Sequence, residues 1–225
     1  MCNLSRMIKE IIDNILGWLA LITLSPIFWL LAGVIRLESP GPAFFRQERI
    51  GKDGYPFVAF KFRSMVDNAT SMGLGFNTAV NDPRISIIGK LLRITSLDEL
   101  PQLFNVIKGE MSLVGPRPTL AYQVARYNDA QKRRLIVKPG ITGWAQINGR
   151  NAIPWEERIK LDIWYVDNWS LGLDFYILLR TVKTWIHREG LYGPSGINYD
   201  FNPMRSRRSQ LLTSLDRKVF GTSNP

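Results

Sequence analysis

The apolar positions of the N-terminal region form one unbroken run. No residue between Asp13 and Arg36 is charged, and the stretch from Ile15 to Ile35 is long enough to cross the hydrocarbon core of a bilayer. A secretory signal peptide begins with a basic leader and has a shorter apolar run, so the acidic residues before this stretch argue against one. We therefore expect this segment to lie in lipid.

Ser25 and Pro26 stand at the centre of the run. A proline inside a helix removes the hydrogen bond to the carbonyl four residues earlier, here Ile22, and clashes with that turn. A neighbouring hydroxyl can satisfy a backbone group that is freed in this way. The pair therefore predicts a bend or a break in the membrane helix.

Basic residues flank the apolar run on both sides. They are Arg6 and Lys9 before it, and Arg36, Arg46 and Arg49 after it. Because Lys and Arg mark the cytoplasmic flanks of membrane segments, both ends are expected on the cytoplasmic side. This favours a re-entrant helix-break-helix element over residues 1–38, which enters one leaflet and returns. A single transmembrane helix with a tolerated proline is the alternative.

Beyond the membrane segment the pattern is that of a globular domain, expected over residues 39–190. Strand-like runs at Ala43 to Gln47 and Phe57 to Phe62, separated by Gly and Asp turn residues, predict a β-hairpin. The region from Asn68 to Arg84 predicts a long loop, and a loop of that length is usually functional, for example as a lid. Residues 191–225 are rich in Pro, Ser, Asn and Arg, which predicts a mobile tail.

Helical periodicity marks further segments of this domain. They are Ile85 to Ile94, Glu99 to Lys108, Thr119 to Val137, Trp155 to Trp169 and Phe175 to Arg188. The fold class expected is therefore α+β and mainly helical. The last segment mixes basic and aromatic residues, which suits an amphipathic helix on an anionic membrane surface. A helix that packs an apolar stripe on the domain core would show the same pattern.

Composition narrows the chemistry. The chain has 225 residues, 45% hydrophobic and 21% charged, which fits one domain with a membrane attachment and excludes a multi-span transporter. A net charge of +10 indicates polyanionic partners such as nucleic acid, anionic lipid or phosphorylated small molecules. Cys2 and His187 are single, which argues against disulfides, cysteine zinc sites and Ser-His-Asp catalysis. Any acid, base or nucleophile is expected to be a carboxylate, hydroxyl or lysine.

The stretch from Thr95 to Asn105 allows two interpretations of Asp98. As a structural residue it is a good N-cap for a helix that begins at Glu99, and a capping box of Ser96 with Glu99 is the alternative. As a functional residue it would use the same geometry, because a helix N-terminus stabilises both a carboxylate and a phosphate. Adjacent carboxylates can also share Mg2+, which often brings substrate phosphates with it.

Basic residues near this stretch are candidate phosphate ligands. Arg117 lies between Pro116 and Pro118 on a stiff turn and can offer a planar donor fork to a phosphate. Lys61 and Arg150 have simpler interpretations, as the solvated face of a strand and as a turn residue. The residues alone leave these interpretations open.

Several motifs together resemble one family, the bacterial sugar transferases, also called monotopic phosphoglycosyl transferases. The motifs are Leu24–Pro26, Ser39–Pro42, Phe45–Gln47, Arg49–Gly51, Phe60–Met65, Ser96–Gln102, Gly109–Pro118, Lys138–Trp144 and Asn148–Asn151. The resemblance implies a helical catalytic domain with a small β-hairpin, amphipathic interfacial helices and an N-terminal re-entrant helix broken at Ser25 and Pro26. It also implies the cytoplasmic face of the bacterial inner membrane.

The implied reaction transfers a sugar 1-phosphate from a UDP-sugar to a membrane polyprenyl phosphate, undecaprenyl phosphate in bacteria, and releases UMP. It would be the first membrane step of glycoconjugate assembly. The resemblance makes Asp98 the nucleophile that forms a covalent phosphosugar intermediate and Glu99 its partner acid, and it requires Mg2+ at these carboxylates. Lys61, Arg117 and Arg150 are implied to contact phosphates or nucleotide.

Asp174 is implied to be a further acidic residue of the active site, with Asp162 as a competing match. Two alternatives to this mechanism stay open. The lipid phosphate can attack directly in a ternary complex, with Asp98 only a metal ligand. A basic membrane-surface binding protein without chemistry is the other. No nucleic-acid partner is expected, because the sequence has no helix-turn-helix signature, RNP-like motif or basic run. The sugar is not predicted, and a homo-oligomer is left open.

Overall fold

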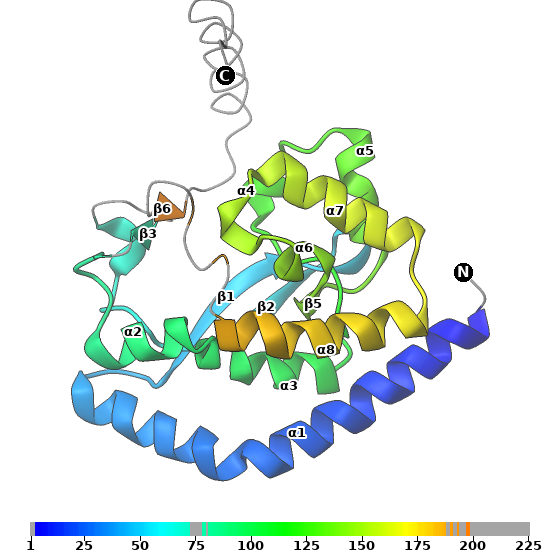
Figure 1. The fold of residues 1–225 in the computed structure, drawn as a ribbon. Coiled ribbons are helices and arrows are strands. Elements are labelled where there is room, and N and C mark those ends of the chain that lie inside the picture. The colour runs from blue at the N-terminus through cyan, green and yellow to red at the C-terminus, as the bar shows by residue number, and fades with distance from the viewer. Residues whose placement is uncertain are drawn as a thin grey trace, which may run out of the picture.

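The computed structural model describes residues 3–72, 78–79, 81–187, 190, 193 and 197–198. Helix α1 (Asn3–Glu38) carries the whole apolar run. Figure 1 shows that α1 bends near its middle, so that both of its arms turn toward the rest of the molecule. The Ser25 hydroxyl donates to the carbonyl of Ile22 at 2.8 Å, which is the carbonyl that Pro26 deprives of its backbone donor. The predicted bend is confirmed, although the helix continues through it.

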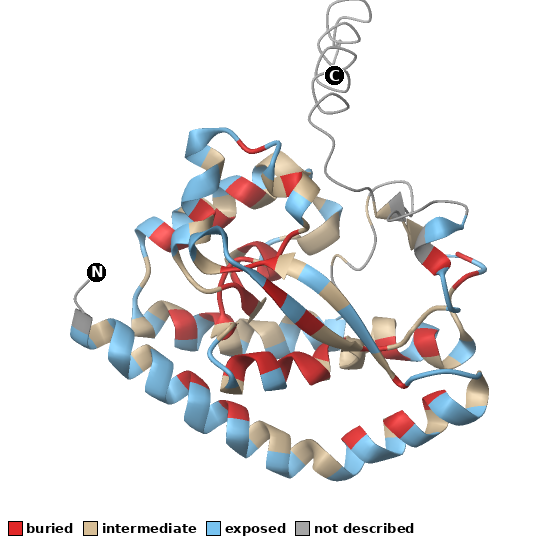
Figure 2. Ribbon diagram, turned by 180° about the vertical axis from the view of Figure 1, so that it is seen from behind, coloured by how far each residue is buried: buried red, intermediate tan, exposed pale blue. Residues whose placement is uncertain are grey.

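The surface of α1 is apolar and mostly exposed. Figure 2 shows exposed residues along most of the outer side of the helix. Ile22, Trp29 and Leu30 of α1 are each about two-thirds exposed. Among the described residues, α1 is the helix that is long and apolar enough to cross a membrane. The exposed apolar surface fits a segment that lies in lipid.

The predicted β-hairpin is confirmed and longer than expected. Strands β1 (Phe44–Ile50) and β2 (Pro56–Phe62) pair antiparallel, with Phe44 opposite Phe62 and Ile50 opposite Pro56. The short 3-10 turn η1 (Lys52–Gly54) joins them. One face of the hairpin is buried, because Phe57 and Ala59 pack with Val106 and Met111.

Two hydrophobic clusters fix the other elements. The C-terminal arm of α1 packs Phe28, Ala32 and Ile35 against Phe62 of the hairpin and Leu92 of α2 (Ile87–Ile94). The second cluster comprises Val114, Ile147, Tyr165, Val166 and Ile177. It joins α6 (Trp144–Ile147), α7 (Trp155–Asp167) and α8 (Leu171–His187). Helices α2, α7 and α8 confirm three of the predicted helical segments.

The packing interpretation of the last predicted helix is confirmed, and its place on a membrane surface stays a prediction. Helix α8 buries Ile177 in the core, as a packing helix does. It also exposes an apolar face that includes Phe175, Leu179 and Ile186, which are 58–67% exposed. The structure therefore leaves α8 with an outer surface that a membrane could contact.

A parallel strand pair was not predicted. Strands β4 (Ser112–Val114) and β5 (Gly140–Thr142) pair with Ser112 opposite Gly140. A Cβ added to Gly140 would lie 2.1 Å from the backbone nitrogen of Gly115, so only glycine allows the two chains to approach this closely. Strands this short carry too few residues to show a period of two.

Two predicted helices are wrong in their extent. The segment predicted as one helix from Thr119 to Val137 is divided into α4 (Ala121–Val124), α5 (Asp129–Lys132) and the 3-10 turn η4 (Arg133–Ile136). Asn128 starts α5 as a new N-cap, because its side chain accepts from the backbone nitrogen of Gln131 at 2.9 Å.

The segment predicted as a helix from Glu99 to Lys108 begins instead with the 3-10 turn η3 (Leu97–Gln102), which is followed by α3 (Leu103–Ile107). The segment ends at Gly109, as predicted, with a positive φ of 77°.

The last strand pair links distant parts of the chain. Strand β3 (Thr78–Ala79), in the predicted loop region, pairs antiparallel with β6 (Ile197–Asn198). The 3-10 turn η2 (Ala69–Ser71) lies in the same region, and η5 (Arg150–Ala152) follows α6. Most of the predicted tail, residues 191–225, lies outside the described residues, so its predicted mobility stays a prediction.

Candidate functional site

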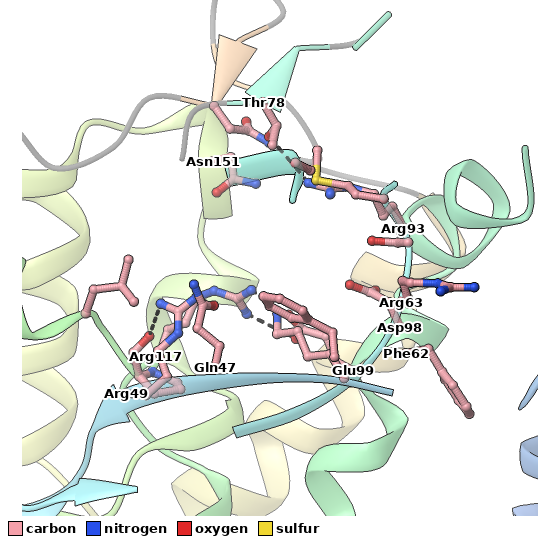
Figure 3. A pocket seen from close by; sticks show the side chains of 18 of the residues that line it. Gln47, Arg49, Phe62, Arg63, Thr78, Arg93, Asp98, Glu99, Arg117 and Asn151 are labelled. Atoms are coloured by element: carbon pink, nitrogen blue, oxygen red, sulfur yellow. Dashed lines mark hydrogen bonds and ion pairs between the residues drawn. The ribbon is translucent and has the colours of Figure 1, made fainter. Parts of the chain in front are cut away.

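A cavity of about 460 Å3 lies between the hairpin, η3, the turn after β4 and η5. Five of the predicted site residues line it: Lys61, Asp98, Glu99, Arg117 and Arg150. In Figure 3, Asp98 and Glu99 lie to one side of the view, Arg49 and Arg117 to the other, and Thr78 and Asn151 across from them. Basic side chains outnumber acidic ones around the cavity, which suits a polyanionic ligand.

The turn η3 presents the two adjacent carboxylates to the cavity. Ser96 begins it in the left-handed conformation, with φ 53°, and its carbonyl accepts from the backbone nitrogen of Glu99 at 3.2 Å. No side chain caps this turn. Both structural interpretations of Asp98 and Glu99, the N-cap and the capping box, are therefore wrong. The carboxylates are left for other partners.

Glu99 is buried and fully engaged by cations. Its Oε1 accepts from Lys61 Nζ at 2.7 Å and from Arg117 Nη2 at 2.5 Å, while its Oε2 accepts from Arg117 Nη1 at 3.1 Å. Burial acts to raise the pKa of Glu99, but the charges of Arg117 and Lys61 outweigh it and hold that pKa well below its ordinary value. Glu99 is therefore a fixed negative charge that positions two cations.

Asp98 is in a different state from its neighbour. Within the described part of the chain its carboxylate has no hydrogen bond and no ion pair within 4 Å, yet it lines the cavity. Burial raises the pKa of Asp98, and the attraction of Lys61 offsets this only in part. The charged carboxylate is poorly stabilised and its oxygens are available, as a nucleophile or metal ligand requires.

Lys61 is not part of a solvated strand face. It stands opposite Phe45 in the hairpin, and its side chain is only 17% exposed. Burial lowers the pKa of Lys61 more than the neighbouring charge of Glu99 raises it. A lysine in this setting keeps its ammonium group next to anions, which here are Glu99 and any bound phosphate.

Arg117 and Arg150 are positioned in different ways. The carbonyl of Arg117 accepts from Arg134 Nη2 at 2.9 Å, and the carbonyl of Pro118 accepts from Arg49 Nη1 at 3.2 Å, so the turn is fixed at both ends. Arg150 is a turn residue with φ 49°, and it also points into the site, where its Nη2 donates to Ser96 Oγ at 3.2 Å. Arg150 is therefore a turn residue that also lines the cavity, and its contact with phosphate or nucleotide stays a prediction.

Sequence reasoning missed several cavity residues. Arg49, Arg93, Arg158 and Gln47 line the cavity but were not predicted as site residues. A usable signal existed on β1. Side chains alternate along a strand, so Gln47 and Arg49 share the face of Phe45, which stands opposite Lys61. No comparable pattern marks Arg93 or Arg158.

Asp174 does not belong to this site, and its assignment there is corrected. It is buried in the first turn of α8, where it accepts from Lys9 Nζ at 2.6 Å, from the Tyr165 hydroxyl at 2.7 Å and from Trp169 Nε1 at 3.0 Å. Its competitor Asp162 also lies outside the cavity lining, in a buried ion pair with Arg134. Neither carboxylate faces the cavity, because each is oriented by a basic partner elsewhere.

Asp98 and Glu99 differ in whether they can serve as metal ligands. Among the described residues, no group of three His, Cys, Asp or Glu side chains converges. Both oxygens of Glu99 already face cations, so Glu99 does not fit as a magnesium ligand in this arrangement. Asp98 does fit, because Mg2+ is commonly bound by one carboxylate together with substrate phosphates and water.

Comparison with known proteins supports the resemblance. A family model for bacterial sugar transferases matches residues 4–188. The uncharacterized sugar transferase EpsL of Bacillus subtilis is 48% identical over 82% of this chain and 90% of its own length. The exopolysaccharide production protein ExoY of Sinorhizobium fredii is 39% identical, over 82% of this chain and 88% of its own length.

A longer relative is named for its reaction. The undecaprenyl-phosphate galactose phosphotransferase of Salmonella typhimurium is 41% identical over 84% of this chain, but the match spans only 42% of that protein. With a family model that covers most of the chain and relatives matched over nearly their whole length, the chain belongs to the bacterial sugar transferase family.

Proposed function

We propose that this enzyme transfers a sugar 1-phosphate from a UDP-sugar to a polyprenyl phosphate, undecaprenyl phosphate in a bacterium, and releases UMP. The names of longer relatives support these substrates, including a UDP-glucose:undecaprenyl-phosphate glucose-1-phosphate transferase of Escherichia coli that is 41% identical. The chain spans about two-fifths of that relative, as of the Salmonella protein. Membership of a transferase family is also the reason to set aside a binding protein without chemistry.

One observation carries the proposal, which is the difference between two neighbouring carboxylates. Glu99 holds Lys61 and Arg117 in place, whereas Asp98 lines the same cavity with its oxygens unengaged by any described residue. A carboxylate that only balanced nearby cations would bond to them, as Glu99 does. The poor stabilisation of the Asp98 carboxylate favours its attack on phosphorus, because the attack turns the carboxylate into an acyl phosphate, in which the negative charge lies on the phosphoryl oxygens instead.

The reaction proceeds in two successive displacements at the phosphorus that carries the sugar. A carboxylate oxygen of Asp98 attacks the phosphorus that carries the sugar. An Asp98–phosphorus bond forms, the bridging bond of the diphosphate breaks, and UMP leaves with that bond's electron pair. An oxygen of the polyprenyl phosphate then attacks the same phosphorus. The acyl phosphate bond breaks, the Asp98 carboxylate is regenerated, and a polyprenyl diphosphate sugar is the product.

The chain's own cations stabilise both displacements. Lys61 and Arg117, fixed by Glu99, and Arg150, fixed at Ser96, provide donors for the oxygens of the transferring phosphoryl group. Asp98 would hold Mg2+ together with the diphosphate of the donor. When bound, that ion supplies charge neutralisation that lets two anions approach one another.

We further propose that α1 is re-entrant and that the enzyme acts on the cytoplasmic face of the inner membrane. The N-terminal arm of α1 bonds to the domain through Lys9 and Asp13, and its C-terminal arm packs through Phe28 and Ile35. A helix whose two arms both contact one domain is easier to place on one side of a bilayer than across it. The phosphate of the lipid acceptor would then lie at the membrane surface, level with the cavity.

The test is formation of a covalent adduct by the purified, full-length protein in lipid nanodiscs. With a UDP-sugar labelled in the sugar and no polyprenyl phosphate, the wild type should retain label, and hydroxylamine should release it as expected for an acyl phosphate. Asp98→Asn should retain none. The control Asp129→Asn changes an exposed carboxylate outside the cavity and should label like the wild type.

Isotope exchange distinguishes the covalent mechanism from direct attack by the lipid phosphate. Labelled UMP should enter the UDP-sugar pool without any lipid acceptor if the intermediate is covalent. Transfer to polyprenyl phosphate without such exchange and without an adduct would instead support direct attack in a ternary complex, with Asp98 as a metal ligand. Absence of transfer from every UDP-sugar tried would contradict the proposed function itself.

A further inference from the structure

One wall of the cavity takes no part in the mechanism above. Strands β3 and β6 form it, with Thr78 directly opposite Asn198 in an antiparallel pair, and both of these residues line the cavity. Figure 3 shows Thr78 across the cavity from Arg117 and Glu99. The hydroxyl of Thr78 accepts from Arg93 Nη2 at 3.4 Å, which connects this wall to α2.

Close contacts fix Gly190, which follows α8, beside the turn η5. Gly190 has a positive φ of 63°, and a Cβ added there would lie 2.4 Å from the carbonyl oxygen of Gly149. The carbonyl of Gly190 accepts from the backbone nitrogen of Asn151 at 3.0 Å. Further along, the backbone nitrogen of Gly193 donates to Asn198 Oδ1 at 2.9 Å, which orients the side-chain amide. Only glycine allows the backbone of Gly190 to approach Gly149 this closely.

The wall differs chemically from the opposite side. Lys61 and Arg117 there attract phosphate oxygens through charge. Thr78 and Asn198 carry a hydroxyl and an amide, which both donate and accept hydrogen bonds and bear no charge. Such groups are suited to the hydroxyls of a sugar, where a substituent of the wrong configuration leaves a buried polar group without a partner.

One residue of this wall lies inside the part of the chain that matches the family, and the other lies outside it. The family match spans residues 4–188, so Thr78 lies within it and Asn198 lies beyond it. Catalysis common to a family belongs with its shared region. A residue outside that region that still lines the cavity is better placed to distinguish one donor from another.

We propose that Thr78 and Asn198 form the subsite for the sugar of the donor and determine which UDP-sugar this enzyme prefers, with Gly190 as a positioning residue. The inference rests on the proposed function, because it requires the donor diphosphate to bind near Asp98. It assigns specificity to β6, a strand that contributes nothing to the displacement at phosphorus.

The experiment compares wild type, Asn198→Ala and Thr78→Val across a panel of UDP-hexoses and UDP-N-acetylhexosamines. We expect either variant to change the ratio of kcat/KM between the best and second-best donor about tenfold, which is the effect of one lost hydrogen bond to a hydroxyl. The inhibition constant of UMP, which lacks the sugar, should stay within twofold of the wild type. A rise in that constant together with an unchanged donor ratio would place these residues at the nucleotide and overturn the proposal.

A backbone variant tests the same subsite without removing its side chains. Gly190→Ala should shift the donor ratio in the same direction as Asn198→Ala, because it forces the chain away from Gly149. The control is Gly172→Ala on α8, where an added Cβ would meet only Ser170 Oγ at 3.9 Å. An unchanged ratio in all three test variants would overturn the proposal.

Equilibrium binding of the same UDP-sugars separates this inference from the proposed function. If the wild type binds some UDP-sugars more tightly than others but transfers none, the proposed function fails. The effect of Asn198→Ala on that binding preference then still tests whether Asn198 belongs to the sugar subsite. If wild type transfers sugar phosphate and its selectivity survives every variant, only the subsite fails. Absence of binding to any UDP-sugar would contradict both.

Discussion

Two ionic clusters of this protein contain similar residues and have different roles. The anchor cluster consists of Lys9, Asp13, Asp174 and their neutral partners, and it joins α1 to β4 and α8. The cavity cluster consists of Lys61, Asp98, Glu99 and Arg117. In the anchor cluster both carboxylates are bonded to described partners, whereas in the cavity cluster one carboxylate is fully bonded and its neighbour has no such bond.

The comparison teaches that burial and charge alone do not identify a functional carboxylate. Asp174 is as buried as Glu99, at 7% exposure, and has a lysine partner as Glu99 does. Asp98 differs from both because its carboxylate oxygens line a cavity and accept no hydrogen bond from a described residue. Groups of the anchor cluster should therefore control stability, and Asp98 should control chemistry.

The largest effect expected is loss of transfer in Asp98→Asn. We expect kcat/KM to fall at least about 1,000-fold, because the amide removes the attacking oxygen while the cations around it remain. Its melting temperature in detergent should be equal to or slightly above that of the wild type, because a partly buried and poorly stabilised charge is removed. A variant that loses activity and also unfolds would show that Asp98 is a structural residue like Asp174.

The second prediction concerns the anchor cluster. Lys9→Met leaves the buried Asp174 without its charged partner, and we expect the free energy of unfolding to fall by about 3–5 kcal/mol. The activity of the molecules that remain folded should stay within about threefold of the wild type. The double variant Lys9→Met/Asp174→Asn should recover part of the stability, since it removes the charge of Asp174. Asp13 also loses Lys9, at 3.7 Å, but it keeps its hydrogen bonds from Ser112 and Leu113. Chemical denaturation in a defined detergent measures this.

A smaller effect is expected for Arg117→Lys. The guanidinium donates to both oxygens of Glu99, and a lysine cannot reproduce that fork. We expect KM for the UDP-sugar to rise about 10- to 100-fold, the loss typical of a charged hydrogen bond, with little change in fold. Arg133→Lys is the matched control, because Arg133 forms an exposed ion pair with Asp167 away from the cavity. Equal effects at both positions would mean that charge alone matters.

The smallest predicted effect is in the pH dependence. Asp98 must be ionised to attack, so kcat/KM should fall as the pH decreases. Because burial raises the pKa of Asp98, this fall should begin at a higher pH than the pKa of a free aspartate would give. The pKa of Glu99 is held well below its ordinary value, so Glu99 stays ionised there. The acid limb should therefore have a slope of one, and a slope of two would contradict the difference between the two carboxylates.

The same difference predicts the sign of a stability effect. Because its pKa is raised in the folded state, ionised Asp98 costs stability at neutral pH, and the cost disappears as pH falls below the unfolded pKa. The advantage of Asp98→Asn in melting temperature should thus be present near pH 7 and vanish in acid. An advantage that grows in acid would show that the pKa of Asp98 is lowered.

Local features of the chain determined much of the fold. The apolar run with Ser25 and Pro26 predicted α1 and its bend, because proline removes one identifiable hydrogen bond wherever it stands in a helix. Alternation predicted the hairpin, and a period of 3.6 predicted α2, α7 and α8. The motif residues Lys61, Asp98, Glu99, Arg117 and Arg150 were assigned to one site, and the structure brings them to one cavity.

Only the tertiary structure decided what each charged side chain does. Whether Glu99 caps a turn or holds Lys61 and Arg117, and whether Asp174 faces the cavity or Lys9, depends on partners that are 18 to 165 residues away in sequence. The same is true of the β4–β5 pair and of Asn198 opposite Thr78. Periodicity reports which face of an element is apolar, but the energy of a buried charge depends on the atoms around it, and those are assembled only by the fold.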